Sequence, residues 1–169
     1  VTNDVLHAVG VEIGLATHKH ETRERAVSDA QENLTYVERF VAAGHAAAPL
    51  ADALAPAGSG PRLVTVAMMR PGDKLASYRL LATALARLAD RPWHLVVIGD
   101  GAARAEVHAA FASFPAQRLR FVGLQPPHAV AALLRTADLF VWPAVAEVLG
   151  LAMLEAQACG VPVIAGRRP

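Results

Sequence analysis

Three shortages in the sequence each exclude a class of protein. Cys159 is the single cysteine, so the chain cannot form an internal disulfide, and a reducing, cytoplasmic setting is expected. Aromatic residues make up only 5% of the chain and no basic stripe accompanies them, which argues against a nucleic-acid-binding surface. No apolar run approaches the roughly 20 residues that a membrane-spanning helix requires. We therefore expect a globular protein that binds no nucleic acid.

The chain also lacks an excess of charge of one sign. Its formal net charge of +1 indicates no strongly charged partner, and it leaves open whether the protein makes a peripheral contact with a membrane. Hydrophobic residues make up 54% of the 169 residues, which is enough for one domain with a sizeable core. Because the chain starts at Val1 and stops at Pro169, we expect sequence to be missing at both ends, including an N-terminal partner domain.

The first 60 residues differ in composition from the rest. Residues Glu21–Ala43 place apolar side chains on one helical face and charges elsewhere, and Gly44 is a candidate C-cap. The apolar face consists of Ala26, Ala30, Leu34, Val37 and Val41. The stretch His45–Gly60 is rich in Ala, Pro and Gly, which predicts a loose connection. We interpret residues 1–60 as a helical segment and linker, a remnant of a partner domain.

From Arg62 onward, short β-rich runs alternate with longer helical segments. The predicted strands are Leu63–Val66, His94–Ile98, Arg120–Val122, Leu139–Trp142 and Val161–Ala165. The predicted helices lie near Leu75–Leu88, Ala102–Phe114, Pro127–Ala137 and Gly150–Cys159. The apolar run Leu95–Ile98 indicates a strand buried on both faces, as in a parallel sheet. We therefore predict an α/β fold, a doubly wound parallel sheet over residues 61–169 that is truncated at its C-terminus and binds ligands beyond the carboxyl ends of its strands.

The segment after the fourth predicted strand carries the most informative motif. A loop bearing Glu147 follows the strand, and Gly150 opens a helix that carries Glu155. Unpaired amides near Gly150, Leu151 and Ala152 and the positive end of the helix dipole suit a phosphate group. In that arrangement Glu155 is placed to accept hydrogen bonds from a ribose diol, and Glu147 faces the sugar.

This segment resembles the E-x7-E signature of the family 4 glycosyltransferases, whose C-terminal domain usually reads P-S-x-x-E-G-F-G-L-x-x-L-E-A-M-A-C-G-x-P-V-I-A. The matching positions are Glu147, Gly150, Leu151, Leu154, Glu155, Ala156, Ala158, Cys159, Gly160, Pro162, Val163, Ile164 and Ala165. The departures from the pattern are Ala144, Val148 and Leu149. Further similar blocks, in the same order, are Leu95–Gly101, Arg120–Gly123 and Ala137–Pro143. The resemblance covers residues 62–166.

The resemblance implies the nucleotide-sugar-binding half of a GT-B enzyme, a retaining glycosyltransferase that moves a sugar from a nucleoside diphosphate to an acceptor. Glu147 would orient the donor sugar and Glu155 would hold the ribose. Similar enzymes hold the donor diphosphate with an Arg and a Lys, for which Arg70 and Lys74 are the candidates, although Arg70 is displaced from the usual position. These cations and the helix amides would stabilise the departing diphosphate. No metal site and no cofactor are therefore expected.

The turn Gly99-Asp100-Gly101 is a second candidate for nucleotide contact. It lacks the third glycine of a dinucleotide-binding fingerprint, because Arg104 stands at that position, so we do not predict NAD. In the enzymes that this chain resembles, the turn lies close to the nucleotide base, which makes Gly99 and Asp100 candidate binding residues. A purely structural turn is the equal alternative.

Other conspicuous residues favour structural roles. The segment His18–Glu21 has two histidines one residue apart but no further ligands nearby, so a solvated segment is favoured over a metal site. Cys159 is expected to be packed rather than reactive. Phe140 and Trp142 are expected in the core.

The donor and the acceptor are not readable from the sequence. A UDP-sugar is favoured, GDP- and ADP-sugars stay open, and the acceptor depends on the partner domain. The competing hypotheses are a non-catalytic nucleotide-sugar-binding module, a sugar-nucleotide epimerase, and a glycosidase that uses Glu147 and Glu155 as acid and base. If both glutamates were helical, eight residues would separate the two backbones by roughly 12 Å, whereas glycosidase carboxyls lie about 5 to 9.5 Å apart. A loop before Gly150 would shorten this gap, so the glycosidase is disfavoured but stays open.

Overall fold

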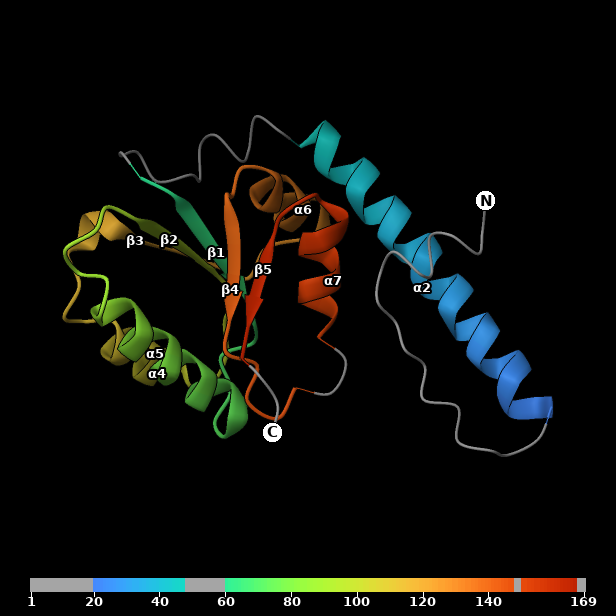
Figure 1. Ribbon diagram of the computed structural model, residues 1–169, viewed down its shortest axis with the longest axis horizontal. Helices are drawn as coiled ribbons and strands as arrows, with labels where there is room; N and C mark the ends of the chain where they lie inside the picture. Colours follow the sequence, from blue (N-terminus) through green and yellow to red (C-terminus); the bar gives the residue numbers. More distant parts are fainter. Residues whose placement is uncertain (1–19, 48–59, 148–149, 167–169) are drawn as a thin grey trace. The chain divides into compact units, whose positions relative to one another are not determined.

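The computed structural model describes residues 20–47, 60–147 and 150–166. The elements in chain order are α2 (His20–Ala46), β1 (Arg62–Val66), α4 (Asp73–Ala86), β2 (His94–Ile98), α5 (Arg104–Ala110), the 3-10 turn η1 (Ala116–Arg118), β3 (Leu119–Gly123), α6 (Pro127–Arg135), β4 (Leu139–Trp142), α7 (Leu151–Ala158) and β5 (Val163–Ala165). The chain divides into two compact units, residues 1–34 and 35–169. The second unit holds the sheet and the end of α2 (Figure 1).

The five strands form one parallel sheet in the order β3-β2-β1-β4-β5. β1 lies in the middle, where Val64 pairs with Val96 on one side and with Phe140 on the other. Every residue of β2 is buried, as the apolar run Leu95–Ile98 predicts. The predicted α/β class with a parallel sheet is confirmed.

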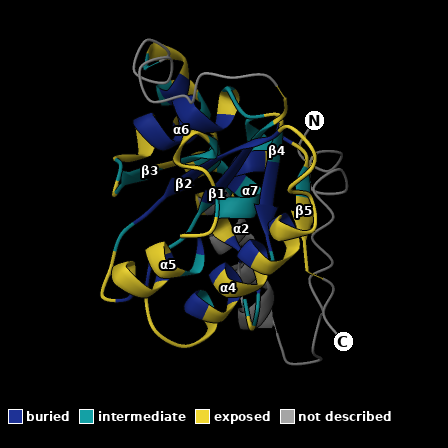
Figure 2. Cartoon of the chain, turned by 90° about the vertical axis from the view of Figure 1, so that its left-hand side faces the viewer, coloured by how far each residue is buried: buried dark blue, intermediate teal, exposed yellow. Residues whose placement is uncertain are grey.

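Helices cover both faces of this sheet (Figure 1). α4 packs beside α5 on one face, and α6 packs beside α7 on the other. The three central strands β2, β1 and β4 are largely buried, whereas the edge strands β3 and β5 are partly exposed (Figure 2). The chain winds outward from β1 to β3 and then crosses to β4 on the other side of β1, so the direction of winding reverses between β1 and β4. In doubly wound sheets, the crevice at the carboxyl ends of two such strands is the usual place for a ligand.

The end of α2 differs from the prediction. The helix continues to Ala46, so the assignment of Gly44 as its C-cap is wrong. A side chain at position 44 would bring its Cβ within 2.7 Å of the Cβ of Ala131 in α6, so this glycine allows the two helices to approach closely. Phe40, one turn earlier, is buried in the hydrophobic core. The end of α2 is therefore packed against the sheet domain.

Most other elements lie close to their predicted positions, but α5 is shorter than the helix predicted near Ala102–Phe114, since it covers only Arg104–Ala110. The strand predicted over Val161–Ala165 is shorter because the amide of Val161 closes the end of α7 by bonding to the Ala156 carbonyl at 2.9 Å. The next residue, Pro162, has no amide hydrogen to donate to a sheet. The predicted connection His45–Gly60 begins later than expected because α2 includes its first residues, and residues 48–59 lie outside the described part of the chain. The start of the His18–Glu21 segment also lies outside it.

Candidate functional site

A pocket of about 250 Å³ opens at the carboxyl ends of β1 and β4. Its walls are formed by residues at and after the ends of β1 and β4, by one residue of α4 and by the start of α7. These are Val66–Met68, Trp142, Glu147, Lys74, Gly150–Met153 and Glu155. This is the point where the winding of the sheet reverses. Topology alone therefore brings side chains from distant parts of the sequence to one place.

Lys74 and Glu147 form an ion pair inside this pocket. Lys74 stands in the first turn of α4, where Gly72 turns the chain into the helix with a φ of 82°. The indole N–H of Trp142 donates a hydrogen bond of 3.2 Å to the same oxygen of Glu147. The ammonium of Lys74 also lies 5.6 Å from the centre of the Trp142 ring, within cation–π range. The three side chains thus form one connected group, which we call the Lys74–Trp142–Glu147 cluster.

This cluster keeps Glu147 ionised. Burial alone would raise the pKa of Glu147, but the hydrogen bonds from Lys74 and Trp142, the positive charge of Lys74 and the amide of Gly150 together lower this pKa below its ordinary value. The side chains of Lys74 and Glu147 are only 14% and 18% exposed, so solvent screens the pair less than a surface pair. An ionised carboxylate accepts hydrogen bonds and donates none, which suits it to bind hydroxyl groups.

The loop between β4 and α7 holds Glu147 through an uncommon backbone conformation. Ala144 and Ala146 have φ values of 58° and 48°, in the left-handed region that costs an alanine about 1 kcal/mol or more. The fully buried hydroxyl of Ser77 in α4 accepts a hydrogen bond of 3.0 Å from the amide of Val145, between the two alanines. This bond connects the loop to the helix that carries Lys74, so it helps to hold Glu147 within reach of Lys74.

The start of α7 carries no side-chain cap. Gly150 stands at the N-cap with a φ of 62° and makes no capping hydrogen bond through a side chain. The first amides of an α-helix have no acceptor within the helix, and the dipole makes this end attractive to anions. Leu151 and Ala152, which follow, line the pocket. The pocket therefore offers anion-binding groups on two sides, the ammonium of Lys74 and the start of α7.

Glu155 is the second carboxylate of the pocket and is almost fully buried, at 7% exposed. Burial raises the pKa of Glu155, and a hydrogen bond from Tyr36 opposes this shift without cancelling it. The hydroxyl of Tyr36 donates this bond to Oε1 of Glu155 over 2.5 Å. Burial, the hydrogen bond and the charge of Glu155 raise the pKa of Tyr36 to about 12, so the phenol stays a donor at neutral pH.

The pocket brings together most of the residues that the sequence predicts for the site. Those that share it are Lys74, Glu147, Gly150, Leu151, Ala152 and Glu155. Arg70 does not line the pocket: it is exposed, and its carbonyl accepts the amide of Leu75 at 3.2 Å. Gly99 and Asp100 also lie outside the lining.

The turn of Gly99 and Gly101 is packed against backbone. A Cβ at Gly99 would lie 2.0 Å from the carbonyl oxygen of Ala67, and one at Gly101 would lie 2.4 Å from that of Met69. Asp100 bonds to the amide of Gly101 at 2.8 Å and forms an exposed ion pair with Arg104. These contacts give the glycines a packing role, whereas contact of the turn with a nucleotide stays a prediction.

Sequence reasoning missed three residues of this arrangement. Trp142 is buried as predicted, but its indole N–H also bonds to Glu147. Ser77 and Tyr36 carried no motif signal, because one acts through a loop amide and the other through a contact between residues 119 positions apart. A buried Trp at the end of a strand that borders the switch point was a usable signal, since its polar group needs a partner.

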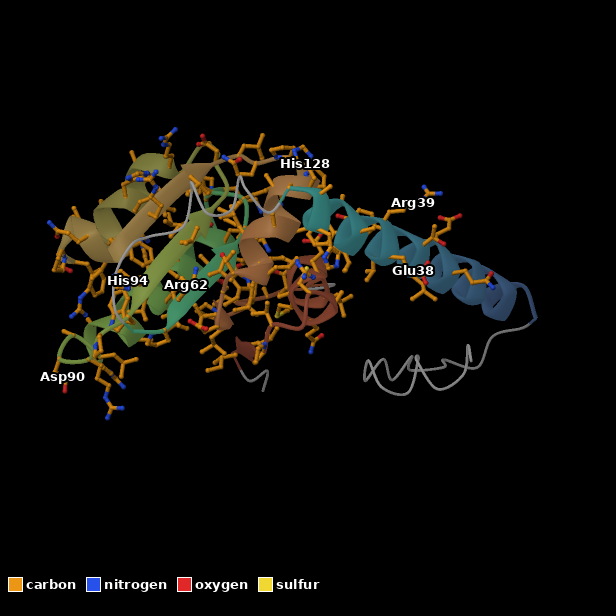
Figure 3. All side chains as sticks on the ribbon, turned by 90° about the horizontal axis from the view of Figure 1, so that it is seen from above. Glu38, Arg39, Arg62, Asp90, His94 and His128 are labelled. Carbon is orange, nitrogen blue, oxygen red and sulfur yellow. The ribbon has the colours of Figure 1, made fainter. Side chains whose placement is uncertain are left out.

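The opposite end of the sheet offers no comparable cluster among the described residues. Arg62 and His94 stand there, at the starts of β1 and β2 (Figure 3). Across the described ranges no three His, Cys, Asp or Glu side chains are gathered closely enough to hold a metal ion. None of the helices described here has the length and apolar character needed to cross a membrane.

Two curated enzymes are similar to part of the chain. The 2-deoxystreptamine glucosyltransferase of Streptomyces kanamyceticus is 36% identical over 91 residues, which cover 52% of this chain and 24% of the relative. The GDP-mannose-dependent alpha-(1-6)-phosphatidylinositol dimannoside mannosyltransferase of Mycobacterium tuberculosis is 38% identical over 86 residues, which cover 50% of this chain and 22% of the relative. The match thus spans about a quarter of each relative's length.

The fold and the family agree with these relatives. Among solved structures, the apo form of the lipopolysaccharide outer core galactosyltransferase WaaB is 24% identical, with a TM-score of 0.50 over 68% of this chain and 34% of that one, a similarity of fold. Residues 60–169 match the model of the family described as glycosyl transferases group 1, and this segment includes all five strands and the whole pocket lining. The chain therefore belongs to the group 1 glycosyl transferases.

Proposed function

We propose that this chain is the donor-binding, C-terminal part of a family 4 retaining glycosyltransferase, which transfers a sugar from a nucleoside diphosphate to an acceptor. The observation that carries the proposal is the pocket at the β1–β4 switch point. There a cation, an uncapped helix start and two carboxylates of different protonation behaviour converge. The cation and the helix start suit a diphosphate, and the two carboxylates suit a sugar and a ribose.

The diphosphate is assigned to the space between Lys74 and the start of α7. A phosphate there receives a charge-assisted hydrogen bond from the ammonium and further bonds from the amides of Leu151 and Ala152. In the transfer step, the bond between the anomeric carbon and the diphosphate oxygen breaks, and negative charge develops on the leaving diphosphate. Preorganised positive groups stabilise that charge, and we assign to them the role that a divalent cation fills in other phosphate sites. Arg70 is kept as a secondary candidate, because its exposed position leaves it outside the pocket lining.

The ion pair of the cluster has a consequence for this proposal. Lys74 is neutralised by Glu147 in the structure, so a bound phosphate has to share or replace the carboxylate as the partner of the ammonium. The indole N–H of Trp142 donates to the same oxygen of Glu147, so this carboxylate has a second donor besides the ammonium. We assign Glu147 to the hydroxyls of the donor sugar, for which an ionised acceptor is suited. Glu155, deeper in the pocket, is assigned to the ribose diol.

The base and the sugar of the donor are proposed only as a class. One relative is by name GDP-mannose-dependent and another is a glucosyltransferase, so related chains differ in what they transfer. A UDP-sugar stays the favoured donor, with GDP- and ADP-sugars as the alternatives. The acceptor is assigned to the part of the longer enzyme that lies outside this chain.

Isothermal titration calorimetry with UDP, GDP and ADP tests the donor site directly. At least one of them is expected to bind, and the matching nucleoside without phosphates is expected to bind far more weakly, because the proposed cation and helix start contact the diphosphate. Glu155→Ala is expected to weaken binding by about tenfold or more, since it removes a charged acceptor from the ribose, while thermal melting shows a smaller change. The proposal is refuted by a parent protein that binds none of the three nucleotides, or by equal affinities for the diphosphate and the nucleoside.

One observation favours a second candidate, a glycosidase. The pKa of Glu147 is lowered and that of Glu155 is raised, which is the division expected between a nucleophile and a general acid. Against it, Glu147 is already neutralised by Lys74, and Tyr36 donates to Glu155. Hydrolysis of aryl glycosides that is abolished by Glu147→Gln or by Glu155→Gln would establish the glycosidase. Absence of turnover in the parent, together with nucleotide binding, supports the donor site.

A further inference from the structure

Glu155 receives a hydrogen bond from outside the segment that matches the family. Tyr36, the donor, lies in α2, whereas the family match begins at residue 60. Within the described residues, this bond is the one that the carboxylate of Glu155 accepts. Tyr36 is not part of the pocket lining, although Glu155 is. The phenol therefore contacts the carboxylate without filling the pocket.

The position of Tyr36 is fixed by the packing of the end of α2. Its ring stacks on that of Phe40, with ring centres 6.0 Å apart and an angle of 28° between the planes. Phe40 is 4% exposed and belongs to the hydrophobic core. One turn further on, Gly44 lies against Ala131 of α6 so closely that a Cβ would not fit. The two contacts hold this part of α2 against the sheet domain, and with it the hydroxyl of Tyr36.

The chemistry of a buried carboxylate explains what this hydroxyl does. A carboxylate in an apolar setting loses its charge unless hydrogen bonds stabilise it. It has two oxygens with about four acceptor positions, so one bond to Oε1 leaves room for further donors. Because the pKa of Tyr36 is about 12, its phenol stays protonated and can donate a hydrogen bond throughout the physiological pH range.

We propose that Tyr36 is a positioning residue of the donor site: its hydroxyl orients Glu155 and keeps it charged, so that Glu155 can accept the ribose diol of a nucleoside diphosphate. The inference rests on the proposed function of this pocket. It also means that the donor site is not complete within residues 60–169, because α2 supplies one of its hydrogen bonds.

Several charged groups surround Glu155 and have to stay constant in a test. Lys74 and Glu147 share its pocket. At the C-cap of α7, the thiol of Cys159 interacts electrostatically with Glu155 and with Arg135 of α6. A change that deletes only the Tyr36 hydroxyl leaves all of these in place.

Tyr36→Phe is that change, since it keeps the ring on Phe40. Two measurements follow in the full chain. The first is the titration of the Glu155 carboxyl carbon by ¹³C NMR, with Glu155→Gln identifying the signal. Loss of the hydroxyl is expected to raise the pKa of Glu155. The second is calorimetric affinity for UDP, GDP and ADP between pH 6 and 8.5.

The affinity of Tyr36→Phe is expected to fall by about three- to tenfold, with the larger loss at the acid end of the range. The sign follows from the carboxylate: a higher pKa leaves more of it protonated and unable to accept at low pH, and alkaline solution restores the charge. Glu38→Gln removes an exposed carboxylate from the same helix (Figure 3) and is expected to change neither the titration nor the affinity. In a Glu155→Gln background, Tyr36→Phe is expected to have no pH-dependent effect.

The outcomes separate this inference from the proposed function. If the parent binds a nucleotide but Tyr36→Phe matches it in affinity and in the pKa of Glu155, Tyr36 has no positioning role. A higher affinity in Tyr36→Phe also overturns the inference, because the hydroxyl would then compete with the ligand. A parent that binds no nucleotide at all removes the proposed function, and the inference with it.

Discussion

Two corners lie along the same edge of the sheet and use glycine differently. At the corner of β1 and β4, the strand ends open into a pocket that gathers Lys74, Glu147 and the start of α7. At the corner of β2, the turn of Gly99 and Gly101 is closed by carbonyl groups of the loop after β1. In the sequence, both corners have a glycine and an acidic residue after a predicted strand, which makes both of them candidates for contact with a ligand. The pocket of the described residues lies beside the first, which we call the open corner, whereas backbone atoms occupy the place of a glycine Cβ in the second, which we call the closed corner.

The difference shows what a glycine at a strand end means. At Gly150, the nearest atom to an added Cβ is the mobile end of the Met153 side chain, at 2.2 Å. At Gly99 the nearest atom is a carbonyl oxygen of the neighbouring backbone, which cannot move aside. Movement of the Met153 side chain can relieve the contact at Gly150, whereas nothing can relieve the contact with backbone at Gly99, so Gly99 is required by close packing.

The largest expected effect is on stability and comes from adding a side chain at Gly99, in the closed corner. Gly99→Ala places a Cβ 2.0 Å from the Ala67 oxygen and forces a φ of 138° on an alanine, so the free energy of unfolding is expected to fall by about 3 to 5 kcal/mol. Gly123→Ala is the matched control, because φ is also positive there but no atom lies within 4 Å, and about 1 kcal/mol is expected. Urea denaturation measures both. Equal losses would mean that backbone strain, not the close contact, explains this turn.

The second effect tests which cation belongs to the open corner. Under the proposed function, Lys74→Ala is expected to lower the affinity for a nucleoside diphosphate by about thirtyfold, near 2 kcal/mol, because a charge-assisted bond to phosphate is lost. Arg70→Ala removes an equal charge from the loop just before α4, outside the pocket lining, and a change below about threefold is expected from long-range attraction alone. Calorimetry in one buffer compares them. A larger loss for Arg70→Ala would place the diphosphate outside the pocket.

The sequence predicted the open corner well because its signals are local. Apolar runs locate the strands, and parallel strands bring their carboxyl ends to one edge, so Lys74 and Glu147 could be expected to meet. The side-chain direction of Arg70 could not be predicted, since it depends on the backbone of a loop with no repeating pattern. The packing role of Gly99 could not be predicted for the same reason, because a close approach between two loops produces no periodic pattern in the sequence of either loop.

Contacts between residues far apart in the chain could not be predicted from the sequence for a related reason. Tyr36 and Glu155 are 119 residues apart, and no spacing rule links them. Gly44 fits the composition of a helix end, yet its actual reason is the approach of Ala131 from another helix. The left-handed φ of Ala144 and Ala146 was equally hidden, because alanine rarely adopts it and Ser77 supplies the support from α4.

A third, smaller effect concerns the pH dependence of the open corner. The pKa of Glu147 is lower in the folded protein than in the unfolded chain, so its contribution to stability is present above the unfolded value and is lost as pH falls through the lowered one. At pH 7, Glu147→Gln is expected to lower the free energy of unfolding by about 1 kcal/mol, a value discounted for partial exposure. The difference from the parent is expected to shrink below about pH 4. Glu106→Gln, an exposed change on α5, is the control for added amide groups. A difference that stays constant with pH would show that packing, not charge, is what the substitution removes.

The smallest effect returns to the closed corner. Asp100 and Arg104 form an ion pair of 3.1 Å with side chains 37% and 57% exposed, so Asp100→Ala is expected to cost less than about 1 kcal/mol of stability. Because Asp100 does not line the pocket, we also expect its loss to change nucleotide affinity by less than about twofold. Arg104→Ala removes the same ion pair from the other side, so it separates the loss of the pair from the loss of a ligand contact. If Asp100→Ala alone weakened binding of one base but not of the others, the base would reach this turn, as the family resemblance implies. The two corners would then be two ends of one donor site, joined when a nucleotide is bound.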